Sequence, residues 1–100
     1  MKLTVLAVPG CPNAPLLEQR LAEVVAGRPG VSVRRVEITD EAAAARWGMT
    51  GSPTLLIDGA DPFARSGAGP ALACRLYRDR NGRPVPVPSA DDLRAAIDRG

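Results

Sequence analysis

The 100-residue sequence contains no histidine and only three aromatic residues, Trp47, Phe63 and Tyr77. The absence of imidazole excludes histidine metal ligands and every catalytic triad or general acid–base pair that depends on one. With so few aromatic side chains, the core has to be built from leucine, valine, isoleucine and alanine. No apolar run approaches the roughly 18 residues that a membrane-spanning helix requires, so we expect no membrane partner.

Lysine is also nearly absent. The 13 basic residues, all arginine except Lys2, are spread along the chain among 11 acidic residues, which gives a net charge of +2. Nucleic-acid-binding proteins concentrate basic charge and often add aromatic stacking platforms, and this sequence has neither. The first residues contain too short an apolar stretch for a signal peptide, and two cysteines are too few for a disulfide framework. We therefore expect a cytoplasmic protein without a nucleic-acid partner.

The apolar pattern predicts one α/β domain over residues 1–100. Near-continuous apolar or β-branched runs predict strands, whereas apolar residues at helical spacing and alanine-rich runs predict helices. In chain order the expected elements are a strand at 3–8, a helix between Asn13 and Gly27, a strand at 31–38, a helix at 40–47, a strand at 54–57, a strand or short helix at 72–77, and a helix at 89–98. Strands separated by a helix predict parallel pairing with right-handed crossovers.

Several short signals refine these boundaries. Asn13 is the expected N-cap of the first helix, Gly48 the C-cap of the second and Ser89 the N-cap of the last. The adjacent Arg34 and Arg35 interrupt the second strand, which is typical of a strand at the edge of a sheet.

Residues 60–88 give a weaker pattern and are interpreted as an insertion. Glycine, proline and serine crowd positions 59–70, and Asp58-Gly59 and Asn81-Gly82 are turn signals. Four arginines, at positions 75, 78, 80 and 83, alternate with other residues around Tyr77. We interpret them as a solvated hairpin, although an anion-binding face is the alternative.

Cys11 is the first residue with chemical interest, because it follows the first strand and opens the first helix. Unpaired N–H groups and the helix dipole at such a position favour the negatively charged thiolate, which is the nucleophilic form of cysteine. The alternative is a small residue that fills a tight strand-to-helix turn. The position favours a reactive thiol.

Two segments together resemble the thioredoxin-like fold family: Pro-Gly-Cys-Pro-Asn-Ala at 9–14 and Gly-Ser-Pro-Thr-Leu-Leu-Ile-Asp-Gly at 51–59. The resemblance covers residues 1–60 and the last helix. With the order β-α-β-α-β-β-α that the sequence pattern predicts, it implies a three-layer α/β sandwich and a sheet of order 2-1-3-4 whose last strand is antiparallel. It also implies that Cys11 is the nucleophile of thiol–disulfide exchange, with Pro53 as a cis-proline beside it. We expect no bound cofactor.

The chain departs from the thioredoxin Cys-x-x-Cys pattern, because Ala14 stands at the second cysteine position. Cys11 then acts alone on a thiol or disulfide substrate, or Cys74 resolves the mixed disulfide, or the redox activity is lost. A strand at 72–77 would place Cys74 on the apolar face with Leu72 and Leu76, where a free cysteine is commonly a buried small hydrophobe. Direct pairing needs the two Cα atoms within about 7 Å of each other.

A soft-metal site is the main alternative to redox chemistry. Two thiolates without histidine suit a linear Cu(I) or Hg(II) ion, with Cys11 and Cys74 as the ligands. The same segments resemble short bacterial thioredoxin-like proteins labelled as related to alkylmercury lyase. Genuine lyases cleave the carbon–mercury bond with two cysteines and an aspartate, and here Asp58, Asp61 or Asp79 would supply the proton. The sequence leaves open whether the protein is an oxidoreductase, such a lyase or no enzyme, and it does not indicate the oligomeric state.

Overall fold

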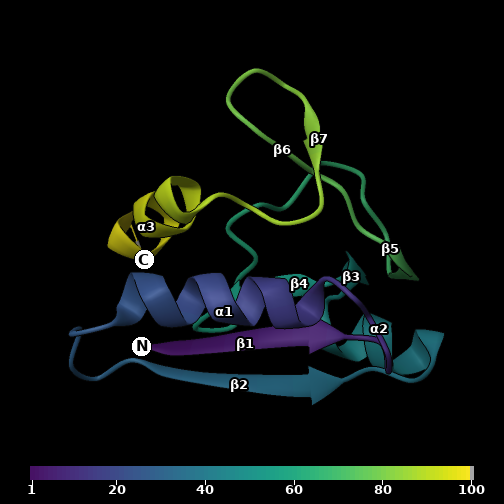
Figure 1. Ribbon diagram of the computed structural model, residues 1–100. Helices are drawn as coiled ribbons and strands as arrows, with labels where there is room; N and C mark the ends of the chain where they lie inside the picture. The colour runs from purple at the N-terminus through teal and green to yellow at the C-terminus, as the bar shows by residue number, and fades with distance from the viewer. Residues whose placement is uncertain (100) are drawn as a thin grey trace.

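A three-stranded sheet forms the centre of the protein (Figure 1). The computed structural model describes residues 1–99. Strand β1 (Lys2–Ala7) lies in the middle, with β2 (Ser32–Glu37) parallel to it on one side and β4 (Thr54–Ile57) antiparallel on the other. The predicted edge position of β2 is confirmed, and its charged side chains face solvent.

Three helices pack against this sheet: α1 (Ala14–Val25), α2 (Glu41–Trp47) and α3 (Ala90–Arg99). Because successive side chains of a strand point to opposite faces, β1 contributes to two apolar clusters. Leu3 and Val5 lie in the cluster that contains α1 and α3, whereas Leu6 lies in the cluster that contains α2. The protein is therefore a mixed α/β structure with helices on both faces of its sheet. No helix within residues 1–99 has both the length and the apolar character to cross a membrane.

The predicted helix ends agree with the structure, except that the expected N-cap of α1 makes no side-chain hydrogen bond. Gly48 ends α2 in the left-handed conformation, at a φ of 82°, and Ser89 Oγ accepts the N–H of Asp92 at 3.1 Å. Asn13 does precede α1, but its side chain makes no capping hydrogen bond. The N-terminal N–H groups of α1 are therefore not satisfied by the residue that the sequence indicated.

The expectation of parallel pairing between helix-separated strands holds for β1 and β2 but is wrong for β4. With seven residues, α2 rises only about 10 Å. The six residues of β1 span about 20 Å, so α2 is too short to return the chain to the other end of the sheet. As a result, β4 starts beside the end of β1 and runs back along it, with Thr54 opposite Leu6.

Residues 59–88 form short strands outside the central sheet: β6 (Tyr77–Arg78) and β7 (Pro84–Val85) lie on the side of α1 and α3 (Figure 1), whereas Leu72 packs against the apolar cluster that contains α2. Strand β5 (Ala71–Cys74) pairs in parallel with β3 (Thr50–Ser52), and β6 forms a small hairpin with β7. The strand or short helix expected at 72–77 is therefore two short strands, and the antiparallel fourth strand of the central sheet that the resemblance implies is wrong. The strand breaks at Arg75, whose side chain turns inward, and within residues 1–99 the central sheet has three strands.

Candidate functional site

Cys11 lies in the loop between β1 and α1, three residues before the first helical residue, Ala14. Its N–H donates to the carbonyl oxygen of Val8 at 3.2 Å, and its own carbonyl accepts the N–H of Ala14 at 3.4 Å. The residue keeps only 6% of its surface exposed and packs in the apolar cluster formed with α1. The predicted position near the start of α1 is confirmed, but the thiol is almost buried.

The peptide bond between Ser52 and Pro53, at the junction of β3 and β4, is cis, as the resemblance implies. Ser52 is 1% exposed, and its Oγ accepts the N–H of Val8 at 3.0 Å. Val8 begins the loop that carries Cys11. This hydrogen bond therefore holds the loop at 8–13 against the junction that contains Pro53.

Cys74 ends β5, and its Cα is the register partner of Ser52 in the parallel β3–β5 pair. Both cysteines are free thiols, but Cys74 is exposed. The expectation of a buried Cys74 on an apolar face is wrong, because β5 lies outside the central sheet and Leu76 is itself 56% exposed. Ser52 thus adjoins both cysteine-bearing segments. Figure 1 shows the start of α1, β3 and β5 at the same end of the molecule.

Arg75 is the residue of this region whose role the sequence did not indicate. It was expected on a solvated hairpin, yet it is 7% exposed. One guanidinium nitrogen, Nη1, donates to Asp61 Oδ2 at 2.7 Å and to Thr54 Oγ1 at 3.2 Å, while Nη2 donates to the carbonyl of Phe63 at 2.7 Å. One feature of the sequence points to the burial of Arg75: it is the single charged residue in the otherwise apolar run at 71–77.

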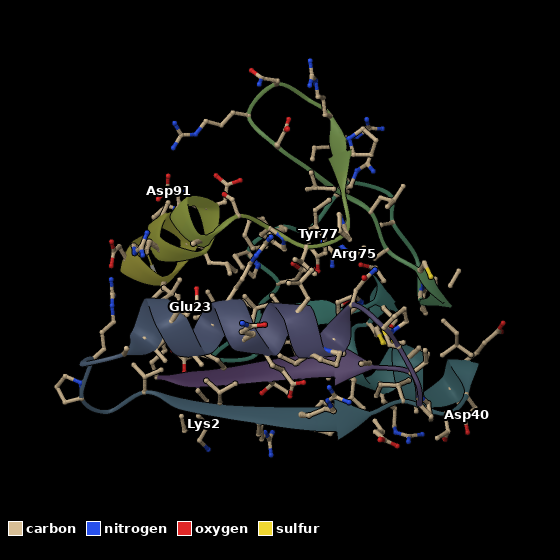
Figure 2. The ribbon with its side chains drawn as sticks, in the orientation of Figure 1. Lys2, Glu23, Asp40, Arg75, Tyr77 and Asp91 are labelled. Atoms are coloured by element: carbon tan, nitrogen blue, oxygen red, sulfur yellow. The ribbon has the colours of Figure 1, made fainter. Side chains whose placement is uncertain are left out.

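Tyr77 connects Arg75 to the cis-proline, and the two side chains lie together in Figure 2. The phenol donates to the carbonyl oxygen of Pro53 at 2.6 Å, and the Arg75 guanidinium lies 4.4 Å from the centre of the ring. Burial raises the pKa of Tyr77 strongly, the Arg75 charge opposes that shift, and negative charge at Asp61 and Cys11 adds to it. The phenol is therefore a neutral hydrogen-bond donor over the whole physiological pH range.

The three aspartates considered as proton donors occupy different surroundings. Asp58 accepts the N–H of Lys2 at 2.8 Å, and Asp79 accepts backbone N–H groups within the β6–β7 turn. Only Asp61 belongs to the region around Pro53, through its ion pair with Arg75. Residues 1–99 contain no group of three or more cysteine, aspartate or glutamate side chains arranged to hold a metal ion.

The site therefore consists of two cysteine-bearing segments, one with a nearly buried thiol and one with an exposed thiol, and a buried polar network, and all three adjoin the Ser52–Pro53 junction. Such an arrangement can carry thiol chemistry, and it can hold a two-coordinate soft metal ion if the sulfur atoms approach each other. No family model, curated protein or solved structure matches the chain.

Proposed function

We propose that the chain is a thioredoxin-like protein that carries out thiol–disulfide exchange with Cys11 as the nucleophile, beside cis-Pro53. The observation that carries the proposal is the 3.0 Å hydrogen bond from Val8 N–H to Ser52 Oγ, which fixes the Cys11 loop against the Pro53 junction. The order β2-β1-β4 with helices on both faces supports the resemblance. Free thiols persist in reducing compartments, so the proposal places the protein in the cytoplasm.

In the exchange step the Cys11 thiol first gives its proton to water. The thiolate attacks one sulfur of a substrate disulfide, forms a mixed disulfide with it and releases the other sulfur as a thiolate. Cys11 reaches this step from the loop that leads into the 12-residue helix α1. Because Cys11 is 6% exposed, the substrate reaches its sulfur when the loop at 8–13 moves outward.

Release of the mixed disulfide needs a second thiol. Cys74 is the internal source in this proposal, since its Cα is the register partner of Ser52 and its side chain is exposed. An external thiol is the alternative source. The two routes differ in whether oxidation produces an internal disulfide or a stable adduct on Cys11.

A two-thiolate site for a soft metal ion is the second candidate, and it rests on the same position of Ser52 between the two cysteine-bearing segments. Cys11 and Cys74 would be the ligands of a linear Cu(I) or Hg(II) ion. Organomercurial cleavage fits less well. Asp61, the aspartate nearest to this region, is engaged as an acceptor by the Arg75 guanidinium rather than as a proton donor.

The proposal is tested by incubating the wild type and the variants Cys11→Ser and Cys74→Ser with glutathione disulfide and measuring the intact mass of each protein. We expect a glutathione adduct on Cys74→Ser, whose only thiol is Cys11. Loss of the two thiol hydrogens in the wild type, without an adduct, would identify Cys74 as the resolving residue. An unmodified Cys74→Ser protein would contradict exchange at Cys11. Retention of one Hg(II) ion by the wild type but by neither variant would favour the metal site.

A further inference from the structure

A cavity of about 450 Å³ opens beside Cys74, on the part of the molecule formed by residues 65–78 and β3. Cys11 does not line it. Its polar lining residues are Thr50, Arg65, Ser66, Cys74, Arg75 and Arg78. The cavity is large enough for a small organic molecule, and it places an exposed thiol among guanidinium and hydroxyl groups.

Within residues 1–99, the charged side chains that line this cavity are all arginines, and no carboxylate is among them. The positive charge of Arg75 is compensated by its ion pair with Asp61. Arg65 and Arg78 are exposed, and neither forms an ion pair with another residue within 1–99. The Arg78 guanidinium donates through Nη1 to the carbonyl oxygen of Gly82 at 2.9 Å, which fixes its position and leaves its other N–H donors available. The cavity therefore presents two uncompensated positive charges.

We propose that this cavity binds small anionic disulfides and that Cys74 exchanges with them. A guanidinium group binds a carboxylate through paired, charge-assisted hydrogen bonds, so Arg65 and Arg78 hold the carboxylates of the ligand. The hydroxyl groups of Thr50 and Ser66 add further donors. The ligand's sulfur atoms then lie toward Cys74. This site does not require Cys11, and it therefore goes beyond the exchange proposed for that residue.

The exchange at Cys74 is balanced without any further reagent. The Cys74 thiol gives its proton to water, and the thiolate attacks one sulfur of the bound disulfide. The ligand's sulfur–sulfur bond breaks, a bond forms between Cys74 Sγ and one half of the ligand, and the other half leaves as a thiolate. Cys74 is oxidised, and the departing half is reduced.

The test uses Cys11→Ser protein, in which Cys74 is the only thiol. Rates of modification are measured by intact mass with glutathione disulfide, which is anionic, and with cystamine, which is cationic. Each rate is divided by the rate for a free cysteine amide, which removes the intrinsic reactivity of the probe. Two nearby positive charges predict a preference for glutathione disulfide of about ten-fold, declining as salt is added.

Matched variants separate the cavity from the net charge of the protein. The double variant Arg65→Gln/Arg78→Gln should lose most of the preference, and Arg65→Lys/Arg78→Lys should keep it. Arg94→Gln, a single charge change on α3 outside the cavity, should also keep it. Equal rates for both probes, an unchanged preference in the glutamine double variant or an equal loss in Arg94→Gln would overturn the proposal. Because Cys11 is absent throughout, none of these results bears on exchange at Cys11.

Discussion

Arg75 and Asp61 form a buried ion pair across 14 positions of the chain, with a distance of 2.7 Å between Nη1 and Oδ2. Their side chains are 6% and 11% exposed. Charges so far from water are stable only when their remaining hydrogen-bonding groups are also satisfied, and Arg75 meets this condition through Thr54 and Phe63. The ion pair thereby connects the loop after β4 to the residue that follows β5.

Replacement of Arg75 by methionine should lower the free energy of unfolding by about 3–5 kcal/mol, because it leaves the Asp61 carboxylate buried without its partner. Urea denaturation followed by circular dichroism measures the change. The control is Arg94→Met, which removes an exposed pair with Asp91 and should cost less than about 1 kcal/mol. Equal losses in the two variants would contradict the role assigned to the buried pair.

Tyr77 should make the protein less stable at alkaline pH. Its folded-state pKa is raised above the ordinary value of 10.0, chiefly by burial. Below pH 10 the phenol is neutral in both states and its contribution is complete. As the pH rises from 10 toward the higher folded-state pKa, only the unfolded state loses the proton, so stability falls by up to about 1.4 kcal/mol per pH unit.

The measurement is direct because Tyr77 is the only tyrosine in the chain. Ultraviolet absorbance of tyrosinate should stay absent from the folded protein at the pH where free tyrosine ionises, and it should appear together with unfolding. Tyr77→Phe should lack this component of the alkaline slope. Ionisation of Tyr77 at its ordinary pH in the folded protein would disprove the prediction.

Gly51→Ala should distort the contact between β3 and β5. Gly51 has a φ of 117°, and an added Cβ would lie 2.7 Å from Arg75 Cβ. Overpacking of this kind costs about 1–3 kcal/mol, and the unfavourable backbone conformation adds to it. Gly69→Ala is the control, since nothing lies within 4 Å of the added atom. Thermal unfolding of both variants should show a lower melting temperature for Gly51→Ala alone.

Ser52→Ala should expose Cys11. The substitution removes the acceptor of the Val8 N–H and should free the loop at 8–13 at a cost of about 1–2 kcal/mol. In a Cys74→Ser background, alkylation by iodoacetamide reports Cys11 alone, and its rate should rise about five- to thirty-fold. Ser66→Ala, at an exposed position, should leave the rate unchanged. No acceleration in Ser52→Ala would show that another contact controls access to Cys11.

The main elements of the fold could be predicted because their signals are local. The apolar run of β1, the caps at Gly48 and Ser89 and the Asp58-Gly59 turn each depend on neighbouring residues. The direction of β4 could not be read in this way, because it depends on how far α2 carries the chain. Strand pairing joins distant segments, and the pattern of β5 does not reveal that its partner is β3.

The same difference between local and long-range signals applies to the residues of the candidate site. The positions of Cys11 and Pro53 follow from motifs of a few residues each. The burial of Arg75 depends on Asp61, which lies in a different loop, and a charged residue without a visible partner is ordinarily interpreted as exposed. The exposure of Cys74 was mispredicted for a related reason, since an apolar face indicates burial only when another layer covers it.

The attachment of residues 59–88 also has a consequence for motion. Most of this segment faces solvent, and it is joined to the rest of the chain through the short β3–β5 ladder, the Arg75–Thr54 hydrogen bond, the Tyr77 phenol and the buried side chain of Val87. We expect such a segment to open at a lower free energy than the sheet that contains β1. Its backbone amides should then exchange with solvent deuterium before those of β1, and the Pro53 carbonyl should lose its Tyr77 partner when the segment opens.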